Sequence, residues 1–181
     1  MDNQYMISNT GNRLTALLKE KLKQDFGITP EQVGMGIPGE NSSLALCIYL
    51  YDIQKNAEVQ AGSHLPIGLN ELQDPSGYYD LYYMLVPYSH SDLQYRAEEE
   101  LKLIDVLVQW LGDIHYLDFD GLEIAISLHN IDIDEKIKIW GGINQSFHMA
   151  LYCKVGPVEI QSGRRKGIRR VKDVQMNYVQ N

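Results

Sequence analysis

The sequence has only two cysteines, Cys47 and Cys153, and each lies inside an apolar run that is typical of a strand. Cysteine is among the most buried residue types, and thiols in the cytosol stay reduced. At 181 residues the chain is long enough to bury a core without disulfides or metals. We therefore expect both cysteines to be buried free thiols.

Long hydrophobic runs are also missing, and the longest fall far short of the roughly 20 residues that a membrane-spanning helix needs. The first ten residues, MDNQYMISNT, lack the basic and then apolar order of a secretory signal. Hydrophobic residues make up 44% of the chain and charged residues 22%, which are values of globular proteins. We expect a soluble protein, made in the cytoplasm, with one domain of ordinary size and a terminal appendage.

The motifs of catalytic and metal sites are absent too. The five histidines never approach one another at the short spacings that metal sites use. Asp132 and Asp134 are spaced as in a calcium loop, but the glycine and the distal glutamate of that loop are missing. The GIPGENSS segment lacks the lysine and hydroxyl pair of a phosphate-binding loop, and no G-x-S-x-G motif occurs. The sequence therefore predicts no enzyme, no catalytic or metal-binding residues, no cofactor and no small-molecule substrate.

Charge is unevenly distributed along the chain. The net charge is −8, yet residues 164–181 carry six cations and one acid, a net charge of +5. The preceding residues carry 10 cations and 23 acids, a net charge of −13. An acidic body with a basic arm indicates charged partners rather than any particular fold. The six cations are Arg164, Arg165, Lys166, Arg169, Arg170 and Lys172.

Hydrophobic periodicity predicts the main elements. Leucines at 14, 17, 18 and 22 predict an amphipathic helix that begins near residue 12 and ends at Gly27. Alternation of apolar residues predicts strands at 33–37, 44–52, 78–88, 121–129 and 147–155, the last one closing at Gly156 and Pro157. The strand at 44–52 is expected to be buried on both faces. Residues 52–77 read as a long connection, and residues 132–143 as a short helix.

A second, longer helix is predicted within residues 89–113. Ser91 and Gln94 have the spacing of a capping box, and the glutamates at 98, 99 and 100 are expected to face water near the positive end of the helix. The predicted apolar stripe consists of Leu101, Ile104, Val108 and Leu111, with Leu107 and Trp110 beside it.

This order of elements predicts an α+β fold. We expect a single domain with a mixed, largely antiparallel sheet flanked by two main helices, plus a C-terminal arm. The predicted domain covers residues 1–162, and the basic arm covers residues 163–181.

Three segments also resemble those of a known family. They are YYDLYYMLVPYS, then EEELKLIDVLVQWLGD, and later IWGGINQSFHMALYCKVGPVEIQS. Their order and spacing resemble the tail-terminator or cap proteins of extracellular contractile injection systems, a phage tail-terminator-like family long described as a domain of unknown function. The resemblance runs from about residue 6 to residue 160. The matching positions are Asp80, Leu81, Tyr82, Tyr83, Leu85, Glu99, Leu107, Leu111, Trp140, Leu151, Tyr152 and Val155.

The resemblance implies a structural role without a cofactor. Proteins of this family form a six-membered ring on the end of the contractile tail farthest from the baseplate, where they stop growth of the inner tube and its sheath. Such a role needs a rigid body that repeats head to tail around a closed ring. The expected partners are other copies of this chain, as a homo-hexamer, and the tube and sheath subunits. Assembly is expected in the cytoplasm, in a particle that is released from the cell or anchored in it.

Two further expectations concern Trp140 and the arm, which lies outside the segments that carry the resemblance. We expect Trp140 to pack against the last strand and the second helix. We expect the arm to bind a neighbouring ring subunit or the sheath, because its cations would be attracted to acidic neighbours. Its apolar residues Val174, Met176 and Tyr178 alternate with polar ones, a pattern that can add a strand to an exposed sheet edge.

The alternative is a nucleic-acid-binding module that acts through the basic residues from Arg164 to Lys172. About six phosphate contacts would make binding fall by something like 10³-fold between 50 and 200 mM salt. The acidic body would then serve as a solubilising partner domain.

Overall fold

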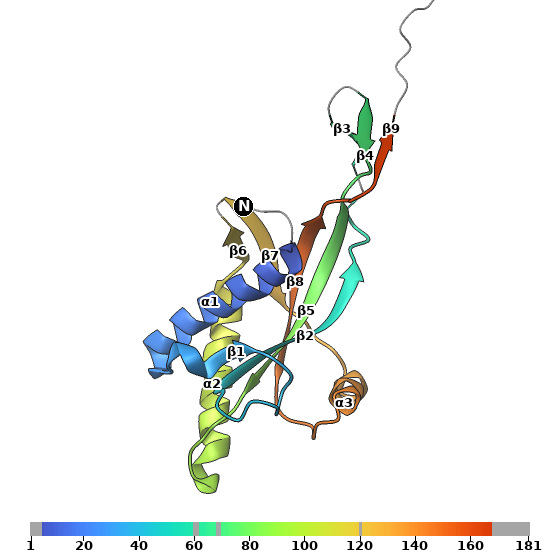
Figure 1. Cartoon of the computed structure of the whole chain (residues 1–181). Helices are drawn as coiled ribbons and strands as arrows, with labels where there is room; N and C mark the ends of the chain where they lie inside the picture. Colours follow the sequence, from blue (N-terminus) through green and yellow to red (C-terminus); the bar gives the residue numbers. More distant parts are fainter. Residues whose placement is uncertain (1–4, 60–61, 68–69, 120, 168–181) are drawn as a thin grey trace, which may run out of the picture.

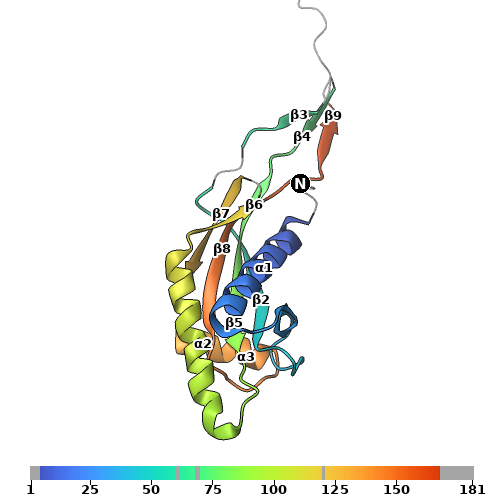
Figure 2. The same cartoon turned by 90° about the vertical axis from the view of Figure 1, so that its left-hand side faces the viewer.

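The computed structural model describes residues 5–59, 62–67, 70–119 and 121–167 (Figure 1). These residues form an elongated body with a narrow projection at one end (Figures 1 and 2). The helices are α1 (Met6–Phe26), η1 (Pro30–Gln32), α2 (Leu93–Asp113) and α3 (Ile133–Gly142). The strands are β1 (Val33–Met35), β2 (Leu46–Lys55), β3 (Leu65–Ile67), β4 (Glu71–Gln73), β5 (Gly77–Pro87), β6 (Tyr116–Phe119), β7 (Leu122–Leu128), β8 (Leu151–Ile160) and β9 (Arg165–Gly167).

The body is built on a six-stranded sheet in the order β1-β2-β5-β8-β7-β6. All neighbouring strands are antiparallel except β1 and β2, which are parallel. Helices α1 and α2 cover one face of this sheet and α3 lies on the other (Figures 1 and 2). The predicted α+β class, with its mixed and largely antiparallel sheet and two main helices, is confirmed.

Helix α1 packs on the sheet through the predicted leucine stripe. Leu14, Leu18 and Leu22 are fully buried, since a spacing of four places them on one face of the helix. Gly27 follows the helix with a φ of 65°, a left-handed conformation that favours glycine. The helix ends where predicted but begins earlier, at Met6.

Helix α2 packs through part of the predicted set: Leu107, Trp110 and Leu111 are buried as expected. Leu101 and Val108, expected in the core, are 54% and 45% exposed. The helix carries two apolar stripes side by side, and periodicity alone cannot decide which one meets the sheet. The stripe that is buried consists of Leu103, Leu107, Trp110 and Leu111.

The predicted capping box of α2 is wrong. Ser91 Oγ donates a hydrogen bond to Oε2 of Glu99 at 2.7 Å, and Asp92 is the N-cap residue without a side-chain hydrogen bond. Ser89 Oγ donates to the same Glu99 oxygen at 2.5 Å, and its N–H donates to Oε1 of Glu100 at 3.1 Å. The hydrogen bonds from Ser89 and Ser91 hold the pKa of Glu99 below its usual range. Glu99 and Glu100, expected to face water, therefore anchor the loop between β5 and α2.

The central strand β5 is buried on both faces. Tyr83 packs in the core beneath α1 and α2, while Met84 and Val86 pack in the core beneath α3. Trp140 of α3 is only 2% exposed, and its indole N–H donates to Oη of Tyr152 in β8 at 3.3 Å. The predicted packing of Trp140 against the last strand is confirmed. Its predicted contact with the second helix is wrong, because α2 covers the opposite face.

Strand β8 does not close at Gly156 and Pro157 but continues to Ile160. Proline has no N–H for the ladder, and the pairing of β8 with β5 shifts register at this point. A Cβ on Gly156 would lie 3.0 Å from Cα of Asp80 and 3.1 Å from the carbonyl oxygen of Tyr79. The strand therefore continues past the proline because the register shifts there. Residue 156 has to be glycine, because a Cβ would be too close to the backbone of β5.

The segment expected to be a long connection contains more structure than predicted. Strand β2 runs on to Lys55, and β3 and β4 form an antiparallel hairpin. The first part of β2 is buried on both faces as predicted, but residues 52–55 are exposed. Strand β6 was not predicted; it pairs with β7 across a turn in which the Gly121 N–H donates to Asp118 Oδ1 at 2.8 Å. Cys47 and Cys153 are buried free thiols, as predicted.

Trp140→Ala should strongly destabilise the protein. Truncating a buried Trp costs about 3 to 5 kcal/mol, a large part of the net stability of a domain. We expect a large fall in the urea midpoint, or insoluble protein. Phe147→Ala is the matched control, because Phe147 lies 6.3 Å from Trp140 between ring centroids but is 49% exposed, and it should change the midpoint little. A soluble and equally stable Trp140→Ala protein that fails only in assembly would make Trp140 an interface residue.

Candidate assembly surface

The projection is a three-stranded antiparallel sheet, in the order β3-β4-β9, that continues two central strands of the body. Gly77 of β5 pairs with Ile160 of β8. After an interruption at residues 74–76 and 161–164, Gln73 of β4 pairs with Arg165 of β9. Two adjacent chain segments therefore lead from the body into the projection, which extends from the end of the body (Figure 2).

Asp74 stabilises the base of this projecting sheet. Its N–H donates to the carbonyl of Arg164 at 3.0 Å. Its carboxylate lies 2.9 Å from Nζ of Lys166 and 3.3 Å from Nδ1 of His64. The hydrogen bond from Lys166, together with the charges of Lys166, His64 and Arg164, holds the pKa of Asp74 below its usual range. One carboxylate therefore links β4 to β9 and to the segment before β3.

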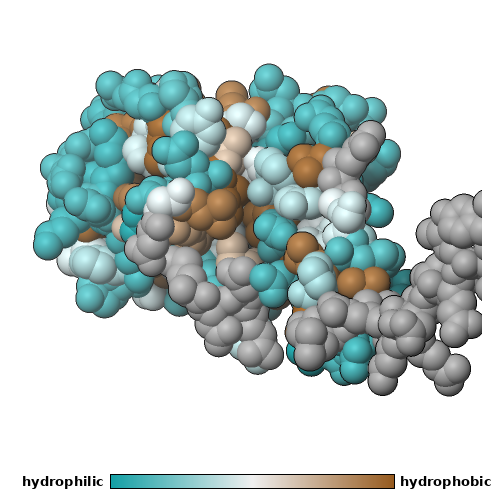
Figure 3. Space-filling model, turned by 90° about the horizontal axis from the view of Figure 1, so that it is seen from above, coloured by the Kyte–Doolittle hydropathy of each residue, from teal (hydrophilic) through white to brown (hydrophobic). Residues whose placement is uncertain are grey.

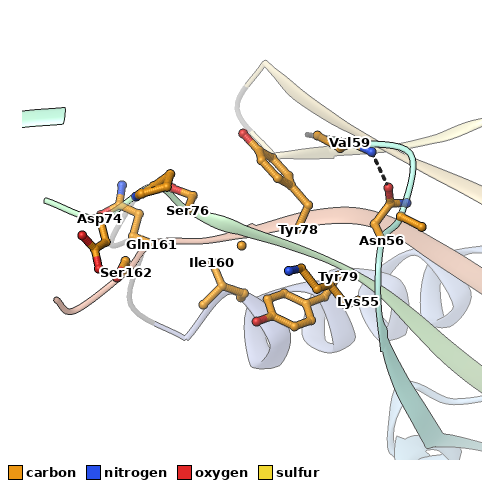
Figure 4. A pocket seen from close by; sticks show the side chains of 13 residues that line it. Lys55, Asn56, Val59, Asp74, Ser76, Tyr78, Tyr79, Ile160, Gln161 and Ser162 are labelled. Carbon is orange, nitrogen blue, oxygen red and sulfur yellow. Dashed lines mark hydrogen bonds between the residues drawn. The ribbon is translucent and has the colours of Figure 1, made fainter. Parts of the chain in front are cut away.

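A cleft of about 790 Å³ lies where the projection meets the body. The end of β2 and the turn after it form one wall, and residues 74–79 and 160–162 form the other (Figure 4). Asn56 shapes the turn, because its Oδ1 accepts the N–H of Val59 at 2.8 Å (Figure 4). Tyr78 and Tyr79 point to opposite sides of β5. Among the residues described around this cleft, only Lys55 and Asp74 carry a full charge at neutral pH, and Asp74 is paired with Lys166.

Serine, glutamate and histidine side chains meet at the start of α2, but not in a catalytic arrangement. His148 Nε2 lies 3.4 Å from Oε2 of Glu100 and 3.0 Å from the carbonyl oxygen of Pro87. The hydroxyls of Ser89 and Ser91 donate to Glu99 rather than to His148. Neither serine therefore forms the serine–histidine pair that a catalytic triad uses.

Within the described ranges, no three His, Cys, Asp or Glu side chains come close enough to hold a metal ion. No helix in this part of the chain is both long and apolar enough to cross a membrane.

The predicted arm begins as a strand of its own subunit. Arg165 and Lys166 lie in β9, where Arg165 Nη1 is 4.0 Å from Oε2 of Glu71 and Lys166 pairs with Asp74. Arg164 lies in the segment before β9 and is exposed. Sequence analysis missed β9 because the segment RKG has no apolar alternation. The other predicted arm residues, Arg169, Arg170, Lys172, Val174, Met176 and Tyr178, lie outside the described residues.

Comparisons with known proteins agree on one family. The model of the Pvc16 N-terminal domain family matches residues 10–172, which is most of the chain. Among solved structures, the fold is similar to the PVC sheath/tube terminator of an extracellular contractile injection system, seen by cryo-EM in the extended state. The TM-score is 0.68 at 13% sequence identity. No curated protein sequence matches.

That likeness covers 97% of this chain but 64% of the terminator chain. At this identity it shows a shared fold. The chain therefore spans less than two thirds of the length of the protein whose fold it shares.

Asp74→Asn should loosen β9 without unfolding the body. The amide keeps the size of the side chain but removes the charge that attracts Lys166 and His64. We expect faster trypsin cleavage after Arg165 and Lys166 and an unchanged thermal midpoint of the body. Asp105→Asn is the matched control, because Asp105 is exposed and makes no ion pair in the described part of the chain. Equal cleavage rates in both variants and the wild type would contradict a role of Asp74 in holding β9.

Proposed function

The chain belongs to the Pvc16 N-terminal domain family, and on that premise we propose that it caps the tail of an extracellular contractile injection system. The observation that carries the proposal is the likeness to a sheath/tube terminator across 97% of this chain. In this function the protein is a structural tail component and not an enzyme. It ends the inner tube and the sheath at the end distal to the baseplate.

Capping of this kind works through shape and contact. We propose that several copies form a closed ring, a homo-hexamer. In such a ring one surface of each copy contacts a second, different surface of the next copy. The main sheet suits such a body, because β5 is packed on both faces and deforms little. One face of the ring would meet the last tube subunits and another the sheath.

The projecting sheet is the proposed contact with neighbouring proteins. Strands β3 and β9 are its two edges, and neither has a further partner among the described residues. Unpaired backbone N–H and C=O groups on such an edge can bind an extended segment of another chain. The outward side chains of β9 are exposed, so a partner can reach this edge.

The basic residues beyond β9 would add electrostatic attraction to this contact. The arm has a net charge of +5 and the body of −13, so each arm is attracted to the body of another copy as well as to acidic tail proteins. Arg165 and Lys166 pair with Glu71 and Asp74 of their own subunit, so we assign the contact with a partner to the later cations. We therefore favour a protein partner over nucleic acid.

Loss of this chain should leave tails of uncontrolled or unstable length, because nothing would stop or hold the last ring of tube and sheath. The measurement is the length distribution of sheathed particles in electron micrographs of a deletion strain. The same strain with the full-length gene restored is the control. Particles of normal length and stability in the deletion strain would contradict the cap function.

A chain ending at Ser162 should fold normally but fail to join or hold the assembly. Every described residue after Ser162 is exposed, so the truncation removes no core side chain. Binding to purified tails across a salt series, against full-length protein, is the measurement, since screening weakens exposed charge attraction. A chain ending at Gly167 keeps β9 and lacks only the later residues, so loss of its binding assigns the contact to those residues and retained binding assigns it to β9. Undiminished binding of the shorter chain at every salt concentration would exclude the arm as the contact.

A further inference from the structure

An apolar groove of about 530 Å³ opens between the start of α1 and the sheet. Its walls and floor come from four strands and one helix, and most of the side chains are aliphatic or aromatic. The space-filling view from the projecting end of the molecule shows hydrophobic side chains gathered at a hollow in the body (Figure 3). The residues that matter here are Met6, Ile7, Met35, Leu50, Tyr83 and Ile160.

The groove is accessible at its rim and buried at its floor. Met35 is 47% exposed and Tyr5, at its helical end, is 71% exposed. Met6 and Tyr83 are buried beneath them. Large apolar side chains left at a rim above a buried apolar floor are typical of a surface that another segment covers.

Tyr83 supplies a second and independent sign of a ligand. The residue is fully buried, yet its hydroxyl makes no hydrogen bond within the described residues. It lies beside Gly11 and beneath Met35, where a Cβ on Gly11 would be 3.4 Å from the hydroxyl and 2.8 Å from the Met35 sulfur. Burial raises the pKa of Tyr83, so the hydroxyl keeps its proton and can donate. A buried donor without an acceptor is costly, and an incoming carbonyl would satisfy it once the flexible Met35 side chain moved aside.

An open sheet edge borders the same groove. Strand β1 pairs with β2 only from Leu46 to Ile48. Beyond Ile48, the side of β2 that faces away from β5 pairs with no strand in the described part of the chain, and Leu50 of this stretch lines the groove. An extended segment could therefore place apolar side chains in the groove and backbone groups along β2.

We propose that the groove binds the segment Asp173–Tyr178 of a second copy of this chain, a proposal that rests on the function proposed above and specifies a contact between ring subunits. Val174, Met176 and Tyr178 alternate with polar residues, so one side of the extended segment is apolar and matches the groove. The tyrosine and methionine side chains have the size and flexibility to fill an apolar groove of this kind.

Charge and geometry favour a second copy as the source of the segment. The basic residues that precede the segment are attracted to the body with its net charge of −13, and that body belongs to the same chain. Strand β9 runs away from the body along the projection (Figure 1). The chain would have to reverse to reach its own groove, whereas a neighbour's groove can lie ahead of it.

Disulfide trapping between full-length chains tests this assignment. One chain carries Met35→Cys, a second chain of different tag length carries Met176→Cys, and the mixture is oxidised mildly. The native cysteines are buried and do not compete. We expect a crosslinked heterodimer on a non-reducing gel. In the first control, Ile133→Cys is used instead of Met35→Cys, because Ile133 is 56% exposed on the opposite face of the sheet. In the second control, Asn177→Cys is used instead of Met176→Cys, because Asn177 lies on the polar side of the segment. Both controls should give much less product.

Several outcomes would overturn the proposal. Equal trapping at Ile133, no trapping at Met35, or trapping only within one chain that carries both substitutions would each exclude a second copy in the groove. Trapping between the two chains only after tails are added would support the proposal, because the segment would then bind the groove in the assembled ring. The result is separable from the cap function: absent trapping together with uncontrolled tail length in the deletion strain rejects the groove contact alone, whereas trapping together with normal tail length rejects the cap.

Discussion

The pairing of β5 with β8 is the interaction on which the rest of the structure depends. It joins the middle of the six-stranded sheet, gives each of the two core clusters its floor, and continues beyond Gly77 and Ile160 into β4 and β9. The irregularity at Gly156 lets this ladder run past a proline, and the Asp74 contacts hold it together where it is interrupted. One ladder, interrupted only at its middle, therefore links the packed body to the projecting sheet.

The two faces of that ladder serve different needs. Helices α1 and α2 bury the larger apolar cluster on one face, and α3 with Trp140 closes a smaller one on the other. At the start of α1 the sheet keeps an open apolar groove above Tyr83. Such a groove is typical of a surface that another segment covers, and it lies on the body rather than on the exposed, basic strand β9 of the projection.

Sequence reasoning reached the fold class, the leucine face of α1, the strand β5 and the burial of Trp140, because each rests on strong periodicity or on a large apolar residue. It failed where one sequence pattern allows two different packing arrangements or hydrogen-bond partners. The stripe with Leu101 and Val108 is as regular as the one with Leu103 and Leu107, and only the packed sheet decides between them. Ser91 has the spacing of a capping box but hydrogen-bonds to Glu99, eight residues away. Such choices depend on tertiary contacts that no local rule contains.

The projecting sheet was the hardest part to foresee for the same physical reason. Strands of three residues such as β3, β4 and β9 bury little apolar surface, so no hydrophobic alternation marks them. Their order comes from continuing a ladder that the body already holds in register, and from ion pairs at Asp74 and Glu71 that involve residues about 90 positions apart. Among the described residues, β3 and β9 have no further strand partner, and the three strands contribute little to the core. In the function proposed above, these properties would let the sheet pair with another chain without loss of core packing in the body.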